Sequence, residues 1–303
     1  MITYTDKITA FTDNDGLSSV KLEGLENFLI AQIFDCGQCF RFDPVGEDSF
    51  EGVAYGRYVR FSQSAPNVLE IHNSTVEDYE NIWRHYLALD ADYSAIRAEI
   101  ASRFKTASHG KDKIMPAAME YGSGIRILRQ ESWETVCSFI ISQNNNIPRI
   151  KGIVERLCEC FGEKISDTAY SFPTAEVIAK LTVEDLAPLR AGFRAKYILD
   201  AAKKVSSGEI DLSKIEKMSL EEADKLLRTI CGVGPKVSAC ILLFGFHKID
   251  AFPIDVWINR ALDYYYNDGF PERFKKYGGI AQQYIFHYIR TCDTAIPDEY
   301  RKK

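Results

Sequence analysis

Residues 219–260 read SLEEADKLLRTICGVGPKVSACILLFGFHKIDAFPIDVWINR, and this stretch decides the fold. Ser219 and Glu222 have the spacing of a capping box, and apolar residues follow at helical intervals, so a helix begins here. Gly232 is a typical stop signal that ends this helix near residue 231. Pro235 suits the first turn of a second helix, because its backbone angle is already helical and it has no amide proton to leave unpaired. The sequence therefore predicts two helices joined by a Gly-Val-Gly turn.

The turn itself indicates contact with a nucleic-acid backbone. Gly232 and Gly234 leave no side chain over the loop, so its amides and the N-terminus of the next helix can approach a phosphate oxygen closely. A Gly-Val-Gly turn alone is a weak signal, since such turns join helices in many unrelated proteins.

Lys236 and Asp255 are the candidate catalytic residues. Lys236 lies in the first turn of the second helix, where the helix dipole disfavours an ammonium ion. A pocket that also desolvates this amine would favour the neutral form, which is the form that a nucleophilic lysine needs. Asp255 precedes a helical run over residues 256–266 and suits its N-cap. A capping carboxylate is held in place and ionised, so it can also stabilise a cation that develops near Lys236.

The hairpin, Lys236 and the sequence Pro253-Ile254-Asp255 together resemble the helix-hairpin-helix DNA glycosylases. In that superfamily a lysine at this place marks the members with lyase activity. Some members carry an iron–sulfur cluster, but no four-cysteine cluster follows Asp255, so none is expected here. The resemblance implies that no metal or redox cofactor is required. Carbonyl groups of the hairpin could hold a simple monovalent or divalent cation against a DNA phosphate.

The segment Cys36-Gly-Gln-Cys-Phe-Arg41 narrows the resemblance to the 8-oxoguanine DNA glycosylases. From the residues alone, Gly37 would be read as a bulge in a strand, and metal binding at the two cysteines is disfavoured because no second pair exists. In the family, the glycine carbonyl accepts a hydrogen bond from a ring N–H that oxidised guanine has and guanine lacks. The resemblance gives this role to Gly37.

Gln282 and Phe286 lie four apart near the C-terminus, so they share one helix face. Separately, a glutamine there suits the surface and a phenylalanine suits the core. In the family the same pair binds the edge and face of a base rotated out of the duplex. Cys240, four residues after Lys236, is by itself a typical core residue, and the resemblance places it beneath that base. The predicted pocket for the lesion base is completed by Phe244 and Pro253.

Two further segments point to the opposite strand. Three asparagines begin at Asn144 and could simply cap a helix, but in the family the first enters the gap left by the flipped base. The resemblance makes Phe193 a wedge beside the orphaned base, and Arg149 and Arg194 its readers. Two guanidinium groups match the acceptors of cytosine, so cytosine is the expected opposite base.

Trp257 departs from the eukaryotic members of the family, which have a phosphate-binding histidine at this place. Its indole N–H could still donate one hydrogen bond. This departure suggests a bacterial version of the eukaryotic-type enzyme.

Composition supports a globular protein of two domains. The chain has 303 residues, of which 46% are hydrophobic and 26% charged. Its eight scattered cysteines are expected to be thiols. The net charge of −6 is unusual for a DNA-binding protein, but residues 1–100 hold 7 Lys+Arg and 17 Asp+Glu, a net −10, which leaves +4 for the remainder. We therefore expect the second part to bind DNA, in a salt-sensitive way.

The expected fold is α+β. Strand signals over residues 50–55, 58–62 and 68–71 and helical signals over 76–89 and 93–104 predict an antiparallel sheet with helices on one face, in an N-terminal domain of residues 1–108 that contributes to the lesion pocket. Residues 109–303 are expected to form a helical domain that contains the hairpin motif (219–246) and the catalytic site. No apolar run suits a signal peptide or a membrane span, so we expect a monomer in the bacterial cytoplasm near the nucleoid, or in a eukaryotic nucleus.

These features predict a bifunctional enzyme that excises 8-oxoguanine opposite cytosine in duplex DNA through a lysine Schiff base and then acts as an abasic-site lyase. Two alternatives stay open. A glycosylase for alkylpurines or other damaged bases would share the hairpin and Asp255, but it would not need Lys236, Gly37 and the Gln282–Phe286 pair together. A non-catalytic DNA-binding protein would share only the hairpin.

Overall fold

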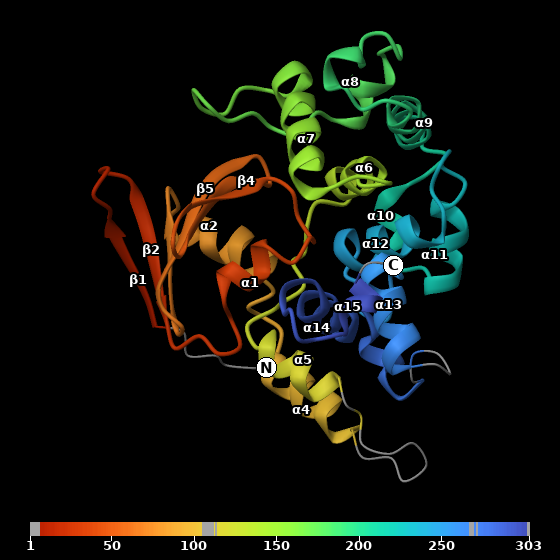
Figure 1. The fold of residues 1–303 in the computed structure, drawn as a ribbon. Coiled ribbons are helices and arrows are strands. Elements are labelled where there is room, and N and C mark those ends of the chain that lie inside the picture. Colours follow the sequence, from red (N-terminus) through yellow and green to blue (C-terminus); the bar gives the residue numbers. More distant parts are fainter. Residues whose placement is uncertain (1–6, 105–111, 113, 267–269, 271, 302–303) are drawn as a thin grey trace.

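The computed structural model describes residues 7–104, 112, 114–266, 270 and 272–301. A strand-rich part comes first in the chain and a helical part follows it, as Figure 1 shows. The predicted α+β fold class is therefore confirmed.

The N-terminal part is built on a six-stranded antiparallel sheet with the order β1-β2-β6-β5-β4-β3. Its strands are β1 (Lys7–Thr12), β2 (Ser18–Glu23), β3 (Phe42–Gly46), β4 (Ser49–Ala54), β5 (Arg57–Ala65) and β6 (Val68–His72). The three strands predicted over residues 50–71 are confirmed as β4, β5 and β6. Tyr55 and Gly56, both with positive φ, form the two-residue turn between β4 and β5, which suits the twist of a hairpin.

Two helical segments of the N-terminal part pack on one face of this sheet. They are α1 (Ile30–Phe34) and the continuous run α2 (Val76–Asp78), η1 (Tyr79–Trp83) and α3 (Arg84–Tyr86). The next helix, α4 (Tyr93–Ser102), lies beside α5 instead, and its buried residues pack in the core of the helical part. The ring of Phe61, on β5, lies 5.5 Å both from that of Phe34, on α1, and from that of Trp83, on η1. Because one strand residue contacts both helices, they cover the same face. This confirms the position predicted for the helix of residues 76–89, whereas the helix predicted over 93–104 forms as α4 but packs against the helical part.

Most of the described residues after α4 are helical, and they include one isolated antiparallel β-bridge between Lys164 and Tyr170. The elements are α5 (Met115–Tyr121), α6 (Ser132–Ile141), α7 (Ile147–Phe161), α8 (Ala175–Ala179), η2 (Ala187–Leu189), α9 (Arg194–Ser206), α10 (Leu212–Ile215), α11 (Leu220–Leu227), α12 (Pro235–Gly245), α13 (Val256–Tyr265), η3 (Glu272–Tyr277), α14 (Gly278–Thr291) and α15 (Asp298–Arg301). No helix within the described ranges is long and apolar enough to cross a membrane.

The two helices of the hairpin, α11 and α12, form as predicted, with one difference at the turn. Ser219 and Glu222 make the capping box at the start of α11. This helix ends at Leu227 and not near residue 231, because tighter turns follow it, such as the bond from the amide of Ile230 to the carbonyl of Leu227. Pro235 opens α12.

Arg126 joins the helical part to the N-terminal part. Its buried guanidinium donates hydrogen bonds to main-chain carbonyl groups of Glu26, Asn27, Ala88 and Ala91. Buried carbonyl groups need such partners, since leaving them unpaired costs free energy. This one side chain therefore holds two segments of the N-terminal part against the strand-like residues that precede α6.

We predict that Arg126→Met lowers the free energy of unfolding by about 3 kcal/mol or more, because several buried carbonyl groups lose their donor at once. Urea unfolding followed by circular dichroism measures this change. A matched control is Arg57→Met, which removes an arginine side chain that is 60% exposed and should cost about 0.5 kcal/mol or less. Equal losses for the two variants would contradict the proposed role of Arg126.

Candidate active site

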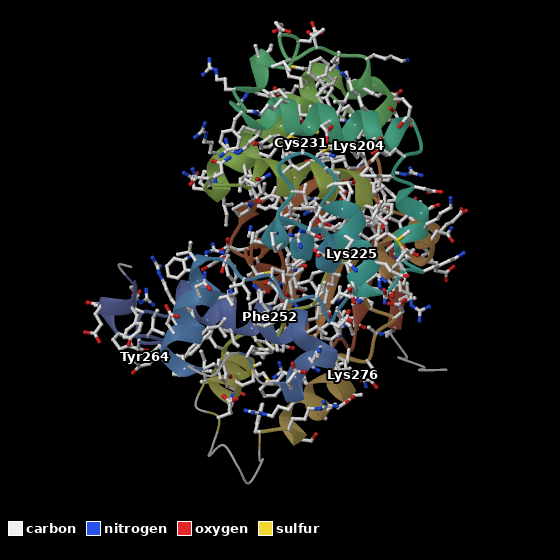
Figure 2. All side chains as sticks on the ribbon, turned by 90° about the vertical axis from the view of Figure 1, so that its right-hand side faces the viewer. Lys204, Lys225, Cys231, Phe252, Tyr264 and Lys276 are labelled. Carbon is white, nitrogen blue, oxygen red and sulfur yellow. The ribbon has the colours of Figure 1, made fainter. Side chains whose placement is uncertain are left out.

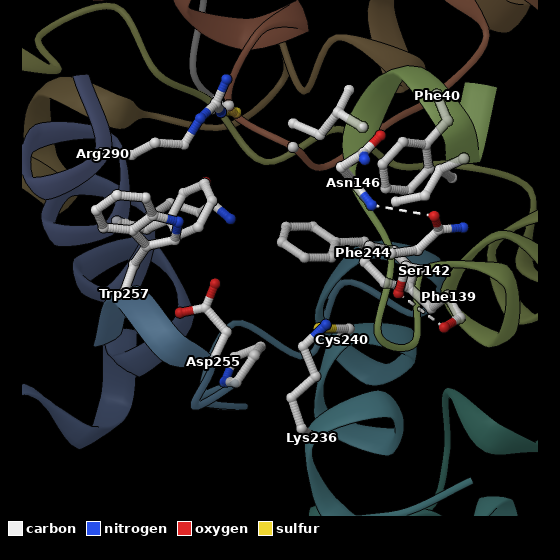
Figure 3. A pocket seen from close by; sticks show the side chains of 18 of the residues that line it. Phe40, Phe139, Ser142, Asn146, Lys236, Cys240, Phe244, Asp255, Trp257 and Arg290 are labelled. Atoms are coloured by element: carbon white, nitrogen blue, oxygen red, sulfur yellow. Dashed lines mark hydrogen bonds between the residues drawn. The ribbon is translucent and has the colours of Figure 1, made fainter. Parts of the chain in front are cut away.

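A cavity of about 450 Å³ brings together residues from distant parts of the chain, shown in Figure 3. Every residue predicted for catalysis or for the lesion-base pocket lines it, and so does Trp257. These lining residues are Gly37, Lys236, Cys240, Phe244, Pro253, Asp255, Trp257, Gln282 and Phe286. Segments separated by more than 200 residues thus form one concave site of the size that holds a small ligand.

Lys236 stands at the start of α12, beside aromatic rings. Gly234 is the N-cap of this helix and Pro235 follows it, so Lys236 lies in the first turn. Its Nζ is 5.9 Å from the centre of the Phe139 ring, which in turn stacks on Phe244 at 5.2 Å. The cavity therefore presents an amine on an apolar floor, which is a suitable setting for a nucleophilic lysine.

Cys240 lies one turn after Lys236 and lines the same cavity. Burial raises the pKa of the Cys240 thiol to about 11, and the charge and hydrogen bond of Lys236 lower it only in part. The thiol is protonated at neutral pH, so it is a poor nucleophile. It packs beside the amine, which makes Lys236 the better candidate nucleophile of the pair.

Asp255 caps α13, which confirms the capping role predicted for it. Its Oδ1 accepts a hydrogen bond of 2.8 Å from the amide of Ile258. Burial raises the pKa of Asp255, while the Ile258 amide and the charge of Lys236 lower it. Figure 3 shows Asp255 and Lys236 projecting from separate elements toward the same space. A fixed carboxylate facing an amine can stabilise positive charge on an atom bound between them.

Gly37 lies directly against Phe286. Its φ is +72°, and a Cβ atom built there would be 3.5 Å from the Phe286 ring. A side chain would therefore strain the backbone and fill the space beside the ring. Gln282 lies one turn before Phe286 on α14, and its Oε1 is buried without a hydrogen-bond partner in the part of the chain that the structure describes. The cavity thus offers a ring, a free acceptor and an exposed main chain.

The asparagine turn joins α6 to α7 at the edge of this cavity, where Asn145 and Asn146 line it and Asn144 and Arg149 do not. Asn146 caps α7 and accepts a hydrogen bond of 3.0 Å from the amide of Arg149. Asn144 has a φ of +46° and is exposed, as is Arg149. Asn146 is therefore the residue that caps the helix, and Asn144 is exposed and has no capping role.

Arg194 lies beneath the asparagine turn. It is only 3% exposed and donates to the main-chain carbonyl groups of Gln143 and Asn144, both at 2.8 Å. Phe193, before it, is 48% exposed, with its ring 4.5 Å from the Arg194 guanidinium carbon. Burial and the charge of Arg149 lower the pKa of Arg194, so the two cations share one region.

The Gly-Val-Gly turn of the hairpin, which follows Cys231 (labelled in Figure 2), lies outside the cavity lining and rests on α9. Gly232 has a φ of +80°, and a Cβ atom there would come within 2.4 Å of the Tyr197 ring. Nothing lies within 4 Å of a Cβ built at Gly234. The ring of Tyr197 is also 5.7 Å from that of Phe193. The turn and the exposed phenylalanine are therefore placed by the same tyrosine.

The cavity also contains residues that sequence reasoning missed, among them Phe139, Gln283 and Arg290. Arg290 follows Phe286 by four residues, so helical spacing alone would have placed it on the same face. Within the described residues, no group of three or more His, Cys, Asp or Glu side chains could hold a metal ion.

Comparison with known proteins finds two family models on this chain. Residues 22–136 match the 8-oxoguanine DNA glycosylase N-terminal domain, and residues 137–273 match the HhH-GPD superfamily of base excision DNA repair proteins.

Individual proteins are also similar. The N-glycosylase/DNA lyase OGG1 of Arabidopsis thaliana is 33% identical over 84% of this chain and 72% of its own length. The Saccharomyces cerevisiae N-glycosylase/DNA lyase is 41% identical, over 45% of this chain but only 40% of its own length. A crystal structure of Clostridium acetobutylicum 8-oxoguanine glycosylase/lyase, in complex with dsDNA containing cytosine opposite to 8-oxoG, superimposes with a TM-score of 0.84. It is 35% identical, and the match covers 94% of this chain and 98% of that one.

We predict that Gly232→Ala lowers the free energy of unfolding by about 2–3 kcal/mol, because it adds a clash with Tyr197 to the strain of a positive φ. Gly208→Ala is the matched control. Gly208 has a φ of +77° but nothing within 4 Å of a built Cβ, so only about 1 kcal/mol of backbone strain is expected. Urea unfolding of both variants measures the difference, and equal losses would show that the Tyr197 ring yields without cost.

Proposed function

The chain belongs to the 8-oxoguanine DNA glycosylases of the HhH-GPD superfamily of base excision DNA repair proteins, and on this premise we propose that Lys236 excises 8-oxoguanine from duplex DNA through a Schiff base. The observation that carries this proposal is the shared cavity. It holds a nucleophile and a carboxylate, Lys236 and Asp255, together with a base-sized recognition surface formed by Gly37, Gln282 and Phe286.

The proposed reaction has two parts. The Lys236 amine attacks C1′ of the flipped nucleotide, the bond from C1′ to the base breaks, and the base leaves with the bonding electrons and takes up a proton. Loss of the amine protons and opening of the sugar give an imine between Lys236 and C1′. The imine makes the C2′ proton acidic, and its removal expels the 3′ phosphate, which is the lyase step.

Asp255 would stabilise positive charge on the sugar while the bond to the base breaks. Its position at the N-cap of α13 fixes the carboxylate before the substrate arrives, so no reorganisation is needed as the charge develops. Since the Asp255 carboxylate also faces Lys236, it can hold the ammonium form that appears after attack.

Recognition of the lesion would fall to the opposite wall. Phe286 suits stacking on the flipped purine, and the unpartnered Oε1 of Gln282 suits an N–H donor on its Watson–Crick edge. Because Gly37 has no side chain, only its main chain faces the space beside the Phe286 ring, where a Cβ atom would lie 3.5 Å from that ring. The Gly37 carbonyl would accept the extra ring N–H of the oxidised base.

The asparagine turn and the start of α9 would recognise the base opposite the lesion. We propose that Asn144 and Phe193, both exposed, occupy and flank the gap in the duplex. Arg149 is exposed, and its donors suit a partner rich in acceptors, such as cytosine. Arg194 lies beside it with its N–H groups on the carbonyl groups of the turn, so it would contact the base only by giving up one of these bonds. The cytosine opposite 8-oxoG in the similar clostridial complex agrees with this proposal.

The proposal also includes contacts with the DNA backbone and the expected cofactor requirement. The amides near Gly232 and Gly234 suit a DNA phosphate at the start of α12, and Trp257 could donate to another. We expect the reaction to need no metal or redox cofactor, although carbonyl groups of the hairpin could hold a simple cation. We also expect the protein to act as a monomer, since its site is complete within one chain.

We predict that borohydride traps a covalent complex with duplexes that contain 8-oxoguanine, most strongly opposite cytosine, because reduction of the imine fixes Lys236 to the DNA. Gel analysis of duplexes with each of the four opposite bases measures this.

The control for trapping is Lys236→Gln, which should bind the same duplexes and give no covalent product. Trapping without preference for cytosine would remove the proposed roles of Arg149 and Arg194. If wild-type protein binds but is never trapped, the Schiff base itself is wrong.

We predict that single-turnover excision falls as the pH drops through the pKa of Asp255, because the protonated acid cannot stabilise a cation. Since burial raises this pKa above 3.8, the loss should begin at higher pH than for an exposed aspartate. Asp255→Asn should be slower by about 10²-fold and lack this acid limb. An unchanged limb in the variant would assign the pH dependence to another group.

A further inference from the structure

The proposed function leaves one cation of the cavity, Arg290, without a role. We propose that Arg290 is a positioning residue that sets the gap between the Gly37 main chain and the Phe286 ring, and thereby the discrimination of the oxidised base from guanine. This inference rests on the proposed function and deepens it.

Arg290 extends the recognition face of α14. Gln282, Phe286 and Arg290 follow one another at intervals of four residues, so they lie along one side of the helix. The Arg290 guanidinium carbon is 5.8 Å from the centre of the Phe286 ring. Figure 3 shows Arg290 at the edge of the cavity. Its charge therefore belongs to the same wall as the proposed base platform.

The guanidinium reaches across to the segment that carries Gly37. Its Nη1 donates to the main-chain carbonyl of Asp35 at 3.0 Å, and its Nη2 donates to Oδ1 of the same residue at 3.2 Å. Asp35 is the C-cap of α1, two residues before Gly37. A planar guanidinium that makes two bonds to one residue fixes orientation as well as distance.

Gln38 anchors the other side of Gly37, but to different elements. Its Nε2 donates to the carbonyl groups of Ile33 and Arg126, both at 2.9 Å, and its Oε1 accepts from the amide of Leu128 at 2.8 Å. None of these partners belongs to α14. Among the described residues, the hydrogen bonds that join residues 35–39 to α14 come from Arg290.

The geometry of this gap matters because a single hydrogen bond distinguishes the two bases. Hydrogen bonds weaken beyond about 3.2 Å, and a recognition site needs its groups within about 0.5 Å of their best positions. Without the bonds from Arg290 to Asp35, Gln38 would still hold Gly37 in place. Phe286 would then no longer hold the base at a fixed distance from the Gly37 main chain.

The bond to Asp35 adds little to folding. The side chains of Arg290 and Asp35 are 21% and 63% exposed, and ion pairs this accessible to solvent contribute little to stability. A variant of Arg290 should therefore fold normally, which separates a positioning role from a structural one.

The test compares binding in a Lys236→Gln background, where no excision disturbs the measurement. Fluorescence anisotropy gives the Kd for duplexes with 8-oxoguanine, guanine or a tetrahydrofuran abasic analogue opposite cytosine. Adding Arg290→Leu should reduce the preference for 8-oxoguanine over guanine about tenfold. Binding of the abasic analogue should not change, because no base occupies the gap.

Two controls sharpen the comparison. Asp35→Asn keeps the main-chain carbonyl that Arg290 binds, so it should change the preference much less. Arg57→Leu removes a surface cation outside the cavity lining and should leave all three Kd values unchanged.

Two outcomes would overturn the inference alone. An unaltered preference in the Arg290→Leu variant would show that the gap does not depend on this bond. An equal loss of affinity for the lesion duplex and the abasic analogue would make Arg290 a phosphate ligand. If the Lys236→Gln parent itself shows no preference for 8-oxoguanine, the proposed function fails first and takes the inference with it.

Discussion

The bonds from the Arg126 guanidinium to four main-chain carbonyl groups are the interaction on which the site depends. Gly37 belongs to the N-terminal part, whereas Lys236 and Phe286 belong to helices far along the chain. Their approach requires a rigid join between the two parts. Arg126 contributes to it with its side chain, together with ion pairs such as Arg41–Glu134 and Lys151–Asp43. The main-chain carbonyl of Arg126 accepts from Gln38, next to Gly37. The same short segment thus contacts the N-terminal part and fixes the position of Gly37, the glycine proposed to contact the lesion base.

The elements that local interactions determine could be predicted from the sequence. The capping box of Ser219 and Glu222, the start of α12 at Pro235 and the cap at Asp255 each depend on residues within a few positions of one another. Local sequence patterns could not predict the pocket, because its members are hundreds of residues apart. Only the resemblance to a family placed Gly37 with Lys236, as the structure does.

What sequence reasoning missed depends on tertiary contacts. The sequence shows that position 194 is a cationic arginine. Its bonds to the Gln143 and Asn144 carbonyl groups, however, form only when α9 packs beneath the turn. The need for glycine at position 232 comes from the Tyr197 ring, 35 residues earlier, and not from the turn alone. Arg290 was missed although its spacing is regular, because its partner, Asp35, lies at the other end of the chain.

The bonds from Arg194 have a consequence for how the protein searches. They hold the asparagine turn in place in the free protein, with Asn144 already in a left-handed conformation. Ordering a loop costs entropy and takes time. Because this turn is already ordered in the free protein, DNA binding requires neither. If Asn144 enters the duplex as proposed, a turn that is ordered beforehand shortens each trial on an intact base pair. Speed of rejection would then depend on this turn as much as strength of recognition does.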